Sequence, residues 1–169
     1  MFHQLKIALI LFCISSCAGC KIGYHFNEAT IPVEAKTATV NLFVNNAPLA
    51  SPTLPLKITE RLKDLIISQS RLNIAQQNGD LVFTGMITGY NIAPVAIQAN
   101  ETAGLNRLTI SISVTYVNKF DEKTNFTQNF TRFADYDSSQ ELSSVEDQLM
   151  DEINRQLVQD VFDRAFSNW

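Results

Sequence analysis

The stretch "RLTISISVTYVN", residues 107–118, decides the fold of this chain, because its side chains alternate between polar and apolar from Arg107 to Tyr116. The apolar positions are Leu108, Ile110, Ile112, Val114 and Tyr116. The positions between them carry hydroxyl groups, at Thr109, Ser111, Ser113 and Thr115. A period of two is typical of a β-strand with one face in the core and the other in polar surroundings. Antiparallel sheets tolerate such a wet face, so the pattern predicts an antiparallel sheet.

Segments on either side of this strand extend the predicted sheet. "DEKTN" turns the chain into "FTQNFTRFADY", residues 126–136, which we expect to be the last strand. Upstream, "RLNIAQ" and "LVFTGMITGY" flank the turn signal "NGD" at 78–80, which predicts a hairpin. Gly85 and Gly89 within that second segment indicate a bulge or a close backbone approach. A first strand is expected at residues 39–45, with Val40, Leu42 and Val44 on one face.

Two segments have the spacing of amphipathic helices. From Pro55 to Gln69, apolar residues recur at helical intervals at Ile58, Leu62, Leu65 and Ile66, with Thr53 or Ser51 as the expected cap. The second helix is expected from about residue 144 to 166, a length of roughly 35 Å. Ser143 or Ser144 would begin it through a capping box. Its predicted buried stripe is Leu142, Val145, Leu149, Ile153, Leu157 and Val161, widened by Met150, Val158, Phe162 and Phe166.

The order of these elements is β-α-β-β-β-β-α. It predicts an α+β two-layer sandwich, with a mostly antiparallel sheet of four to five strands and two helices on one face. We expect a single domain over residues 37–169.

The N-terminal segment has the features of a lipoprotein signal. Lys6 precedes the apolar run "IALILFCI", which is far shorter than the ~20 residues of a membrane-spanning helix. Two cysteines partly fit a lipid attachment site: Cys17 after Ile14, Ser15 and Ser16, and Cys20 after Ala18 and Gly19. Attachment at Cys20 would remove the other cysteines with the signal and leave no orphan thiol. We therefore expect residues 1–19 to be the signal peptide, Cys20 to be lipidated with Cys17 as the alternative, and residues 20–36 to be a tether. The remaining alternative is a plain secreted protein.

Composition limits the possible partners. The chain is 46% hydrophobic and 18% charged, which is ordinary for a globular domain. Its net charge is −4, and loss of Lys6 would leave 12 basic and 17 acidic residues. This acidic balance argues against nucleic acid, and any anionic ligand would need a local basic cluster.

Catalytic and metal-binding motifs are scarce. His25 is the one histidine beyond the signal, so a His-based triad or zinc site has nothing to build on. Ser138 and Ser139 lie near carboxylates, but a helix-capping role explains the serines of this region better. Asp135, Asp137 and Glu141 lack the spacing of a calcium loop, so we expect a solvated turn. The glycines of "FTGMITGY" do not precede a helix, so they do not form a phosphate-binding loop. Together these observations lead us to expect no cofactor and no catalytic residue.

Several quoted segments together resemble one family. A lipobox cysteine, "KIGYHF", "APLASPTL", "NGDLVFTGMITGY", "LNRLTISISV" and above all "RFADYDSSQ" resemble the lipopolysaccharide-assembly lipoprotein LptE in the form found in Bacteroidetes. The resemblance covers residues 20–169. It implies a non-enzymatic outer-membrane lipoprotein that faces the periplasm or sits inside the LptD β-barrel. Such a protein helps the barrel assemble and contacts lipopolysaccharide on its way to the outer leaflet.

These expectations direct attention to particular surfaces. Lys119, Lys123 and Arg132, around and beyond the turn before the last strand, are the expected contacts for the phosphates of lipopolysaccharide, and an ordinary solvated turn is the alternative. Arg61 and Lys63 are less suitable because acidic neighbours on the same helix balance them. The apolar segment 91–106 is expected to be a loop, and packing of this loop in the core is an equal alternative to partner contact. The candidates for partner contact are Pro94, Val95, Ile97 and Leu105. The hydroxyl face of residues 109–115 suits either water or the polar interior of a barrel. The alternative functions are a non-catalytic periplasmic scaffold lipoprotein of another envelope complex and a small lipoprotein hydrolase.

Overall fold

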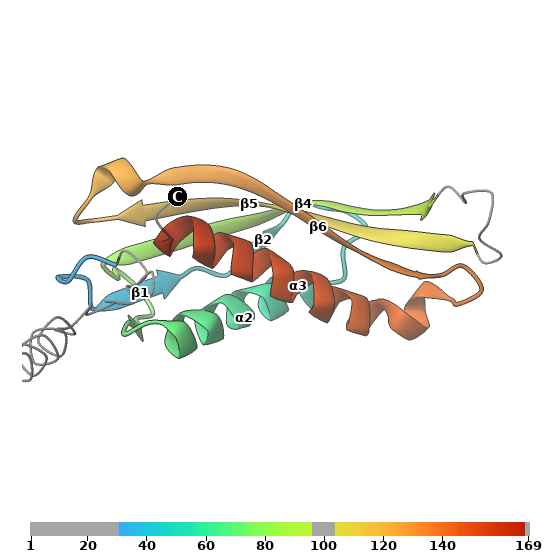
Figure 1. Cartoon of the computed structure of the whole chain (residues 1–169), viewed down its shortest axis with the longest axis horizontal. Coiled ribbons are helices and arrows are strands. Elements are labelled where there is room, and N and C mark those ends of the chain that lie inside the picture. Colours follow the sequence, from blue (N-terminus) through green and yellow to red (C-terminus); the bar gives the residue numbers. More distant parts are fainter. Residues whose placement is uncertain (1–30, 96–103, 168–169) are drawn as a thin grey trace, which may run out of the picture.

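One mixed sheet of six strands forms the centre of the molecule, with two helices along one of its faces (Figure 1). The computed structural model describes residues 31–95 and 104–167. The strands are β1 (Thr37–Val40), β2 (Val44–Asn45), β3 (Asn73–Ile74), β4 (Leu81–Val95), β5 (Leu105–Asn118) and β6 (Phe126–Asp137). The sheet order is β3-β1-β4-β5-β6, and β2 pairs with β4 beyond β1. The predicted α+β sandwich with both helices on one face is therefore confirmed, although the sheet also contains parallel pairs.

The three long strands β4, β5 and β6 form an antiparallel meander. Their register runs from Leu81 opposite Asn118 to Val95 opposite Leu105, and from Tyr116 opposite Phe126 to Leu105 opposite Asp137. In β5, Leu108, Ile110, Ile112, Val114 and Tyr116 are all buried against the helices. The alternation that predicts this strand is thus confirmed from Leu108 to Tyr116.

The prediction that residues 71–76 and 81–90 form a hairpin is wrong. β3 and β4 both pair with β1 in parallel, on opposite sides of it. The connection between them crosses β1 at Thr39, whose Oγ1 accepts the N–H of Gly79. A Cβ on Gly79 would lie 2.7 Å from the Thr39 nitrogen, so glycine is needed for this close crossing. The turn residues match a hairpin locally, but β1 occupies the position between the two strands.

Both glycines of β4 have the roles that the sequence indicates. Gly85 lies under the ring of Phe43, and a Cβ there would overlap that ring. Gly89 follows a register shift between Ile87 and Gly89, which is the expected bulge. The bulge absorbs Thr88, so Ile87 and Tyr90 both face the core.

The expected strand at 39–45 is interrupted. β1 ends at Val40 and β2 begins at Val44, with Phe43 turned inward between them. Phe43 donates its N–H to the Thr59 hydroxyl instead of to a neighbouring strand. Leu42 and Val44 are 62% and 53% exposed whereas Val40 is buried, so the prediction that the three share one face is wrong.

The two helices are α2 (Leu54–Gln69) and α3 (Leu142–Phe166). The predicted buried stripe of α3 is confirmed, with Leu142 and Val145 half-buried and the rest fully buried. Thr53 stands at the N-cap of α2, as predicted, but its side chain makes no cap bond. The capping box predicted at Ser143 or Ser144 is wrong, because α3 begins at Leu142 with Glu141 at the N-cap. Ser144 instead donates its hydroxyl to the Glu141 carbonyl.

Aromatic rings fill the core between the sheet and the end of α3. Phe83, Tyr116 and Phe166 contact one another with ring centroids 4.9 to 6.1 Å apart. Burial raises the pKa of Tyr116 to about 12, because the phenolate would lose its hydration.

Asn154 on α3 is a polar exception in the core. It is 2% exposed, and neither atom of its amide has a partner among the described residues.

Candidate functional site

The face of the meander opposite the helices carries almost no charge. We define the polar sheet face by its positions on β4, β5 and β6. These are Thr84, Met86, Gly89, Asn91, Thr109, Ser111, Ser113, Thr115, Thr127, Asn129, Thr131 and Phe133. None of these residues is ionisable, and most carry a hydroxyl or an amide. The register places them side by side in rows across the three strands.

Hydroxyl groups pair across the strands of this face. Ser111 Oγ lies 2.8 Å from Thr131 Oγ1, and Thr115 Oγ1 lies 2.9 Å from Thr127 Oγ1. On β4, Thr84 accepts a hydrogen bond from the Asn41 amide. A paired hydroxyl still has lone pairs to offer, because each oxygen accepts two hydrogen bonds. The polar sheet face can therefore bind a polar surface without burying a charge.

One end of the polar sheet face is closed by an ion pair. Arg107 on β5 makes two hydrogen bonds to Asp135 on β6, at 2.7 and 2.8 Å, and lies over the Phe133 ring. The Arg107 guanidinium holds the pKa of the Asp135 carboxyl below its usual range. These two charges satisfy each other and leave the neighbouring rows uncharged.

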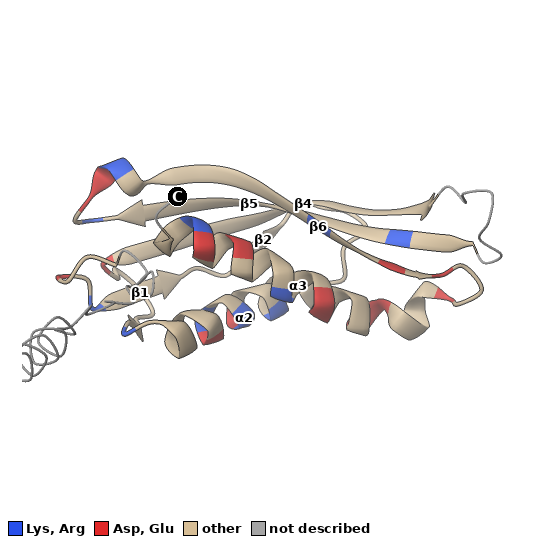
Figure 2. Ribbon diagram, viewed as in Figure 1, with Lys and Arg blue, Asp and Glu red and all other residues tan. Residues whose placement is uncertain are grey.

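Charged residues lie mainly on the helices and near the ends of the strands (Figure 2). Lys57 on α2 reaches Asp147 and Asp151 on α3, at 3.1 and 3.5 Å. The hydrogen bond to Asp147 raises the pKa of Lys57. The helix-covered side is therefore the charged side of the molecule, and the polar sheet face is the neutral side.

The structure separates the three expected lipopolysaccharide contacts into two places. Lys119 donates to the Asn78 carbonyl, and Lys123 lies in the short 3-10 helix η1 (Glu122–Thr124) of the same turn. Arg132 lies six residues along β6 from Phe126, roughly 20 Å at the rise of a strand. Its guanidinium binds both oxygens of Asp160 on α3, at 2.6 and 2.7 Å.

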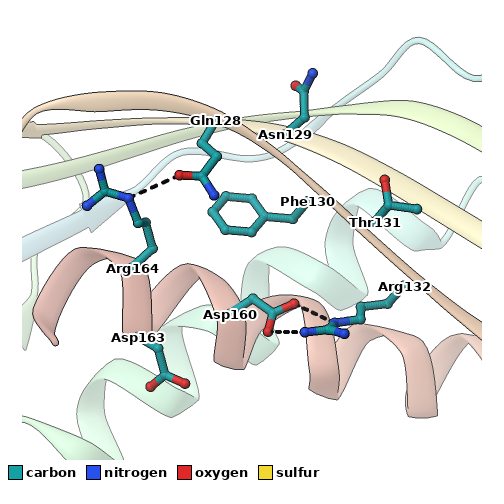
Figure 3. Close-up of a pocket in the computed structure, with 8 residues that line it drawn as sticks. All are labelled: Gln128, Asn129, Phe130, Thr131, Arg132, Asp160, Asp163 and Arg164. Carbon is teal, nitrogen blue, oxygen red and sulfur yellow. Dashed lines mark hydrogen bonds and ion pairs between the residues drawn. The ribbon is translucent and has the colours of Figure 1, made fainter. Parts of the chain in front are cut away.

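Arg132 borders a groove between β6 and α3 that the sequence does not reveal. The groove has a volume of about 460 Å³, and Figure 3 shows the side chains that line it. Arg164 on α3 donates to Gln128 on β6, and Arg132 pairs with Asp160 farther along. The residues on its β6 side are consecutive, from Gln128 to Arg132. The partners of the two arginines lie 28 and 36 residues away in sequence, so no local pattern could have indicated them.

The prediction that residues 91–106 form a loop is wrong at both ends of this segment. Pro94 and Val95 belong to β4, and Leu105 begins β5 opposite Val95. Ile97 lies outside the described residues, as do Cys17 and Cys20. The strand pairing extends farther than expected because Pro94 falls at the outer end of a long hairpin, where its missing N–H costs little.

The chain matches the family model described as "LptE: Lipopolysaccharide-assembly" over residues 35–165, which is most of its length. The chain belongs to the LptE family. No curated protein matches this sequence. Membership in the LptE family identifies the chain as a lipoprotein-type component of lipopolysaccharide assembly.

Solved structures share the fold of this LptE-family chain at low sequence identity. A putative neuraminyllactose-binding hemagglutinin homolog from Helicobacter pylori aligns at TM-score 0.53 and 7% identity, covering 82% of this chain and 87% of that one. A hypothetical protein from Chlamydia trachomatis aligns at TM-score 0.51 and 8% identity, covering 78% and 98%. A minor lipoprotein from Acinetobacter baumannii aligns at 0.47 and 12%, covering 76% and 90%. The first two similarities support the fold alone.

The LptE family consists of non-enzymatic scaffold lipoproteins. The carboxylates considered above have structural roles here, since Asp135 binds Arg107 and Asp137 accepts the N–H of Ser139. In residues 31–95 and 104–167, no three potential metal ligands come together. Nor does any helix in this part of the LptE-family chain have the length and apolarity to cross a bilayer.

Proposed function

We propose that this protein is an outer-membrane lipoprotein that occupies the lumen of an LptD-like β-barrel. In this role it assists assembly of the barrel and takes part in lipopolysaccharide transport to the outer leaflet. The observation that carries the proposal is the polar sheet face, found in a chain of the LptE family.

The polar sheet face suits the inner wall of a barrel. Lumen-facing side chains of membrane barrels are polar, and they alternate with lipid-facing ones along each strand. Burying an unpaired charge against such a wall would cost several kcal/mol, whereas hydroxyl and amide groups exchange water for wall residues at little cost. The rows of Ser, Thr and Asn on β4, β5 and β6 meet this requirement.

The lipopolysaccharide contact is proposed at Lys119, Lys123 and Arg132. Lys119 and Lys123 share one exposed turn, whereas Arg132 already binds Asp160. The turn therefore supplies the freer positive charge for a phosphate, and Arg132 a secondary contact. Lys119→Glu with Lys123→Glu should weaken lipopolysaccharide binding more than Arg132→Gln does. Equal binding by the folded double variant and the wild type would rule out the turn.

The barrel contact is proposed at the outer end of the β4–β5 hairpin. Pro94 is exposed there, and Val95 and Leu105 are half-buried opposite each other. We include Ile97, which follows Val95 by two residues, in the same contact. Apolar side chains at the end of a long hairpin are available to a partner without unfolding the sheet.

The membrane attachment is proposed through a lipid on Cys20, with Cys17 as the alternative. Residues 1–19 would be removed as the signal, residues 20–36 would tether, and residues 37–169 would form the LptE-like domain. Cys20→Ala should abolish acylation and release the protein into the periplasm, while Cys17→Ala should not. Mass spectrometry that finds Cys17 as the first residue of the mature protein would reverse the assignment.

The central test is isolation of the tagged protein from detergent-solubilised outer membranes. We expect the LptD-like barrel to co-purify with the wild type and to be lost with Ser113→Lys, which places a charge in the polar sheet face. Gln148→Lys on the exposed side of α3 is the matched control and should retain the barrel. Recovery of a different envelope complex, with no barrel of this type, would support the alternative scaffold function instead.

A further inference from the structure

The two edges of the sheet differ sharply in how much backbone they leave unpaired. At one edge lies β3, which has only two residues, and β2 beside β4 is equally short. At the other edge lies β6, with twelve residues and no further strand on its outer side among the described residues. A strand edge of this length is a template for pairing with another chain.

The register shows which groups of β6 are free. Ser138 donates its N–H to the Gly104 carbonyl, so even-numbered residues of β6 direct their backbone groups toward β5. The odd-numbered residues then direct their N–H and C=O groups outward. Thr127, Asn129, Thr131 and Phe133 therefore present alternating donors and acceptors along the free edge.

Nothing on β6 itself protects this edge in the usual ways. The strand contains no proline and no lysine, and its register with β5 is continuous over all twelve residues. Each of its three charged residues is already bonded within the chain. Arg132 binds Asp160 on α3, Asp135 binds Arg107 on β5, and Asp137 accepts the N–H of Ser139. Short strands, bulges, lysines and prolines are the common devices against edge pairing.

The groove described above runs along this same edge. Its β6 wall consists of five consecutive residues, which include Asn129 and Thr131 from the polar sheet face and Phe130 from the core face. A groove can touch both faces of one strand only where it follows the strand's edge. Asp160, Asp163 and Arg164 on α3 form the opposite wall (Figure 3). The groove thus offers space for side chains of a segment lying beside β6.

From these features we infer that an extended, uncharged segment of the barrel partner adds to β6 as an additional strand of the sheet. The inference rests on the proposed function, and it names the surface through which the partner is held. A row of alternating donors and acceptors matches the backbone of an extended polypeptide, and a lipid offers no such row. The segment is uncharged because the groove has no excess of either charge: Arg132 and Asp160 bind each other, and Asp163 and Arg164 bring the sum of its charges to zero.

A second copy of this chain is a poorer occupant of the edge. Antiparallel pairing of β6 with itself would bring the two α3 helices side by side, because each packs along its own β6. That helix is strongly acidic. Its charged residues are Glu146, Asp147, Asp151, Glu152, Asp160 and Asp163 against Arg155 and Arg164. Repulsion between two such helices opposes self-pairing.

Proline substitution tests the edge without touching the pairing to β5. Thr131→Pro removes one outward N–H, and Thr131→Ala keeps it while removing the same hydroxyl. Asn129→Pro and Asn129→Ala form a second matched pair. We expect each proline variant to lower the amount of co-purified barrel by about tenfold, the effect of one or two lost hydrogen bonds. The alanine variants measure what loss of the same side chain costs the polar sheet face, so the comparison that tests the edge is between each proline variant and its alanine partner. Retention of the barrel by a folded Thr131→Pro variant at the level of Thr131→Ala would overturn the inference.

Amide hydrogen exchange on the wild type tests the edge even where a proline variant fails to fold. Peptides covering residues 126–133 should exchange at least about tenfold more slowly in the barrel complex than in the isolated protein. Peptides from β5 serve as controls, since their amides are paired in both states. Unchanged exchange at 126–133 in an intact barrel complex would contradict the edge inference and leave the proposed function standing. Absence of any barrel from wild-type preparations would contradict the proposed function, and the inference with it. Protection accompanied by a dimer of this chain would assign the edge to self-pairing.

Discussion

The two faces of the meander are built by the same three strands, and they differ in almost every physical property. The helix-covered face is apolar, dry and tightly packed, with Ile110 and Ile112 fully buried between sheet and helices. The polar sheet face has hydroxyl pairs such as Ser111 with Thr131, and its side chains on β6 are exposed. Alternate residues of one strand therefore build the core and the proposed binding face separately, because successive side chains point to opposite faces. The comparison predicts that substitutions on the first face affect folding and that those on the second affect binding.

The largest expected effect is a charge placed under the sheet. Leu149→Asp or Ile153→Asp would bury a carboxylate with no partner, at a cost of several kcal/mol against a total stability of about 5 to 15 kcal/mol. We expect neither variant to fold, as judged by circular dichroism and thermal melting. Gln148→Asp, one residue from Leu149 but exposed, is the matched control and should melt like the wild type. A folded Ile153→Asp variant would contradict the two-layer packing.

A smaller effect is expected at the two glycines of β4, Gly85 and Gly89, which lie on opposite faces of the sheet. Gly85→Ala would push a methyl group into the Phe43 ring, and overpacking of this kind costs about 1 to 3 kcal/mol. Gly89→Ala would place its methyl 3.2 Å from Ser111 Cβ, where the neighbour moves more easily, and should cost under about 1 kcal/mol. Urea denaturation measures both free energies of unfolding. Recovery of stability in Gly85→Ala when Phe43→Leu is added would confirm the cause, and equal losses at the two glycines would argue against it.

Asn154 allows a test in the stabilising direction. Its amide is buried among apolar side chains without a partner in the described structure, which is costly because the amide has lost its hydrogen bonds to water. Asn154→Leu should therefore raise the free energy of unfolding by about 1 to 2 kcal/mol. Asn154→Asp should lower it, because a carboxylate is harder to bury than an amide. A destabilised Asn154→Leu variant would mean that the asparagine has a partner outside the described residues.

The smallest effect is expected at the Arg107–Asp135 pair, which closes one end of the polar sheet face. Because Arg107 lowers the pKa of Asp135 in the folded protein, the pair stabilises above the unfolded carboxyl pKa of about 3.9. This contribution is lost as the pH falls through the lowered folded value. Arg107→Gln should cost at most about 1 kcal/mol at pH 7, and its difference from wild type should disappear at strongly acidic pH. A difference that stays constant down to pH 2 would assign the effect to the packing of Arg107 on Phe133.

The spacing of apolar residues predicted those parts of the fold in which the sequence of one strand or helix is enough to show which side is buried. The alternation at 107–118 and the helical stripe of α3 both carried enough apolar residues to fix which side faces inward. The pairing of β3 with β1 could not be predicted, because the turn at 78–80 looks the same whether or not a strand lies between its arms. The interruption at Phe43 was missed for a similar reason, since its partner Thr59 lies in a helix 16 residues away.

The candidate site was predictable only in part. The hydroxyl face of residues 109–115 follows from the sequence alone. Its continuation onto β4 and β6 required the register, including the bulge at Gly89. The groove along β6 depends on Asp160 and Arg164, which reach β6 only after α3 has packed. Residue spacing within one element carries no information about such contacts between elements.

The length of β5 sets a distance scale for the whole molecule. Fourteen residues at the rise of a strand span roughly 45 Å, whereas the hydrocarbon core of a bilayer is about 30 Å thick. The turn with Lys119 and Lys123 lies at one end of this span, beside the Asn78 carbonyl near the start of β1. The hairpin end at Pro94 and Leu105 lies at the other. A body of this length that stands upright in a membrane protein reaches both aqueous surfaces at once. Water-soluble labels applied from opposite sides would then reach its two ends separately.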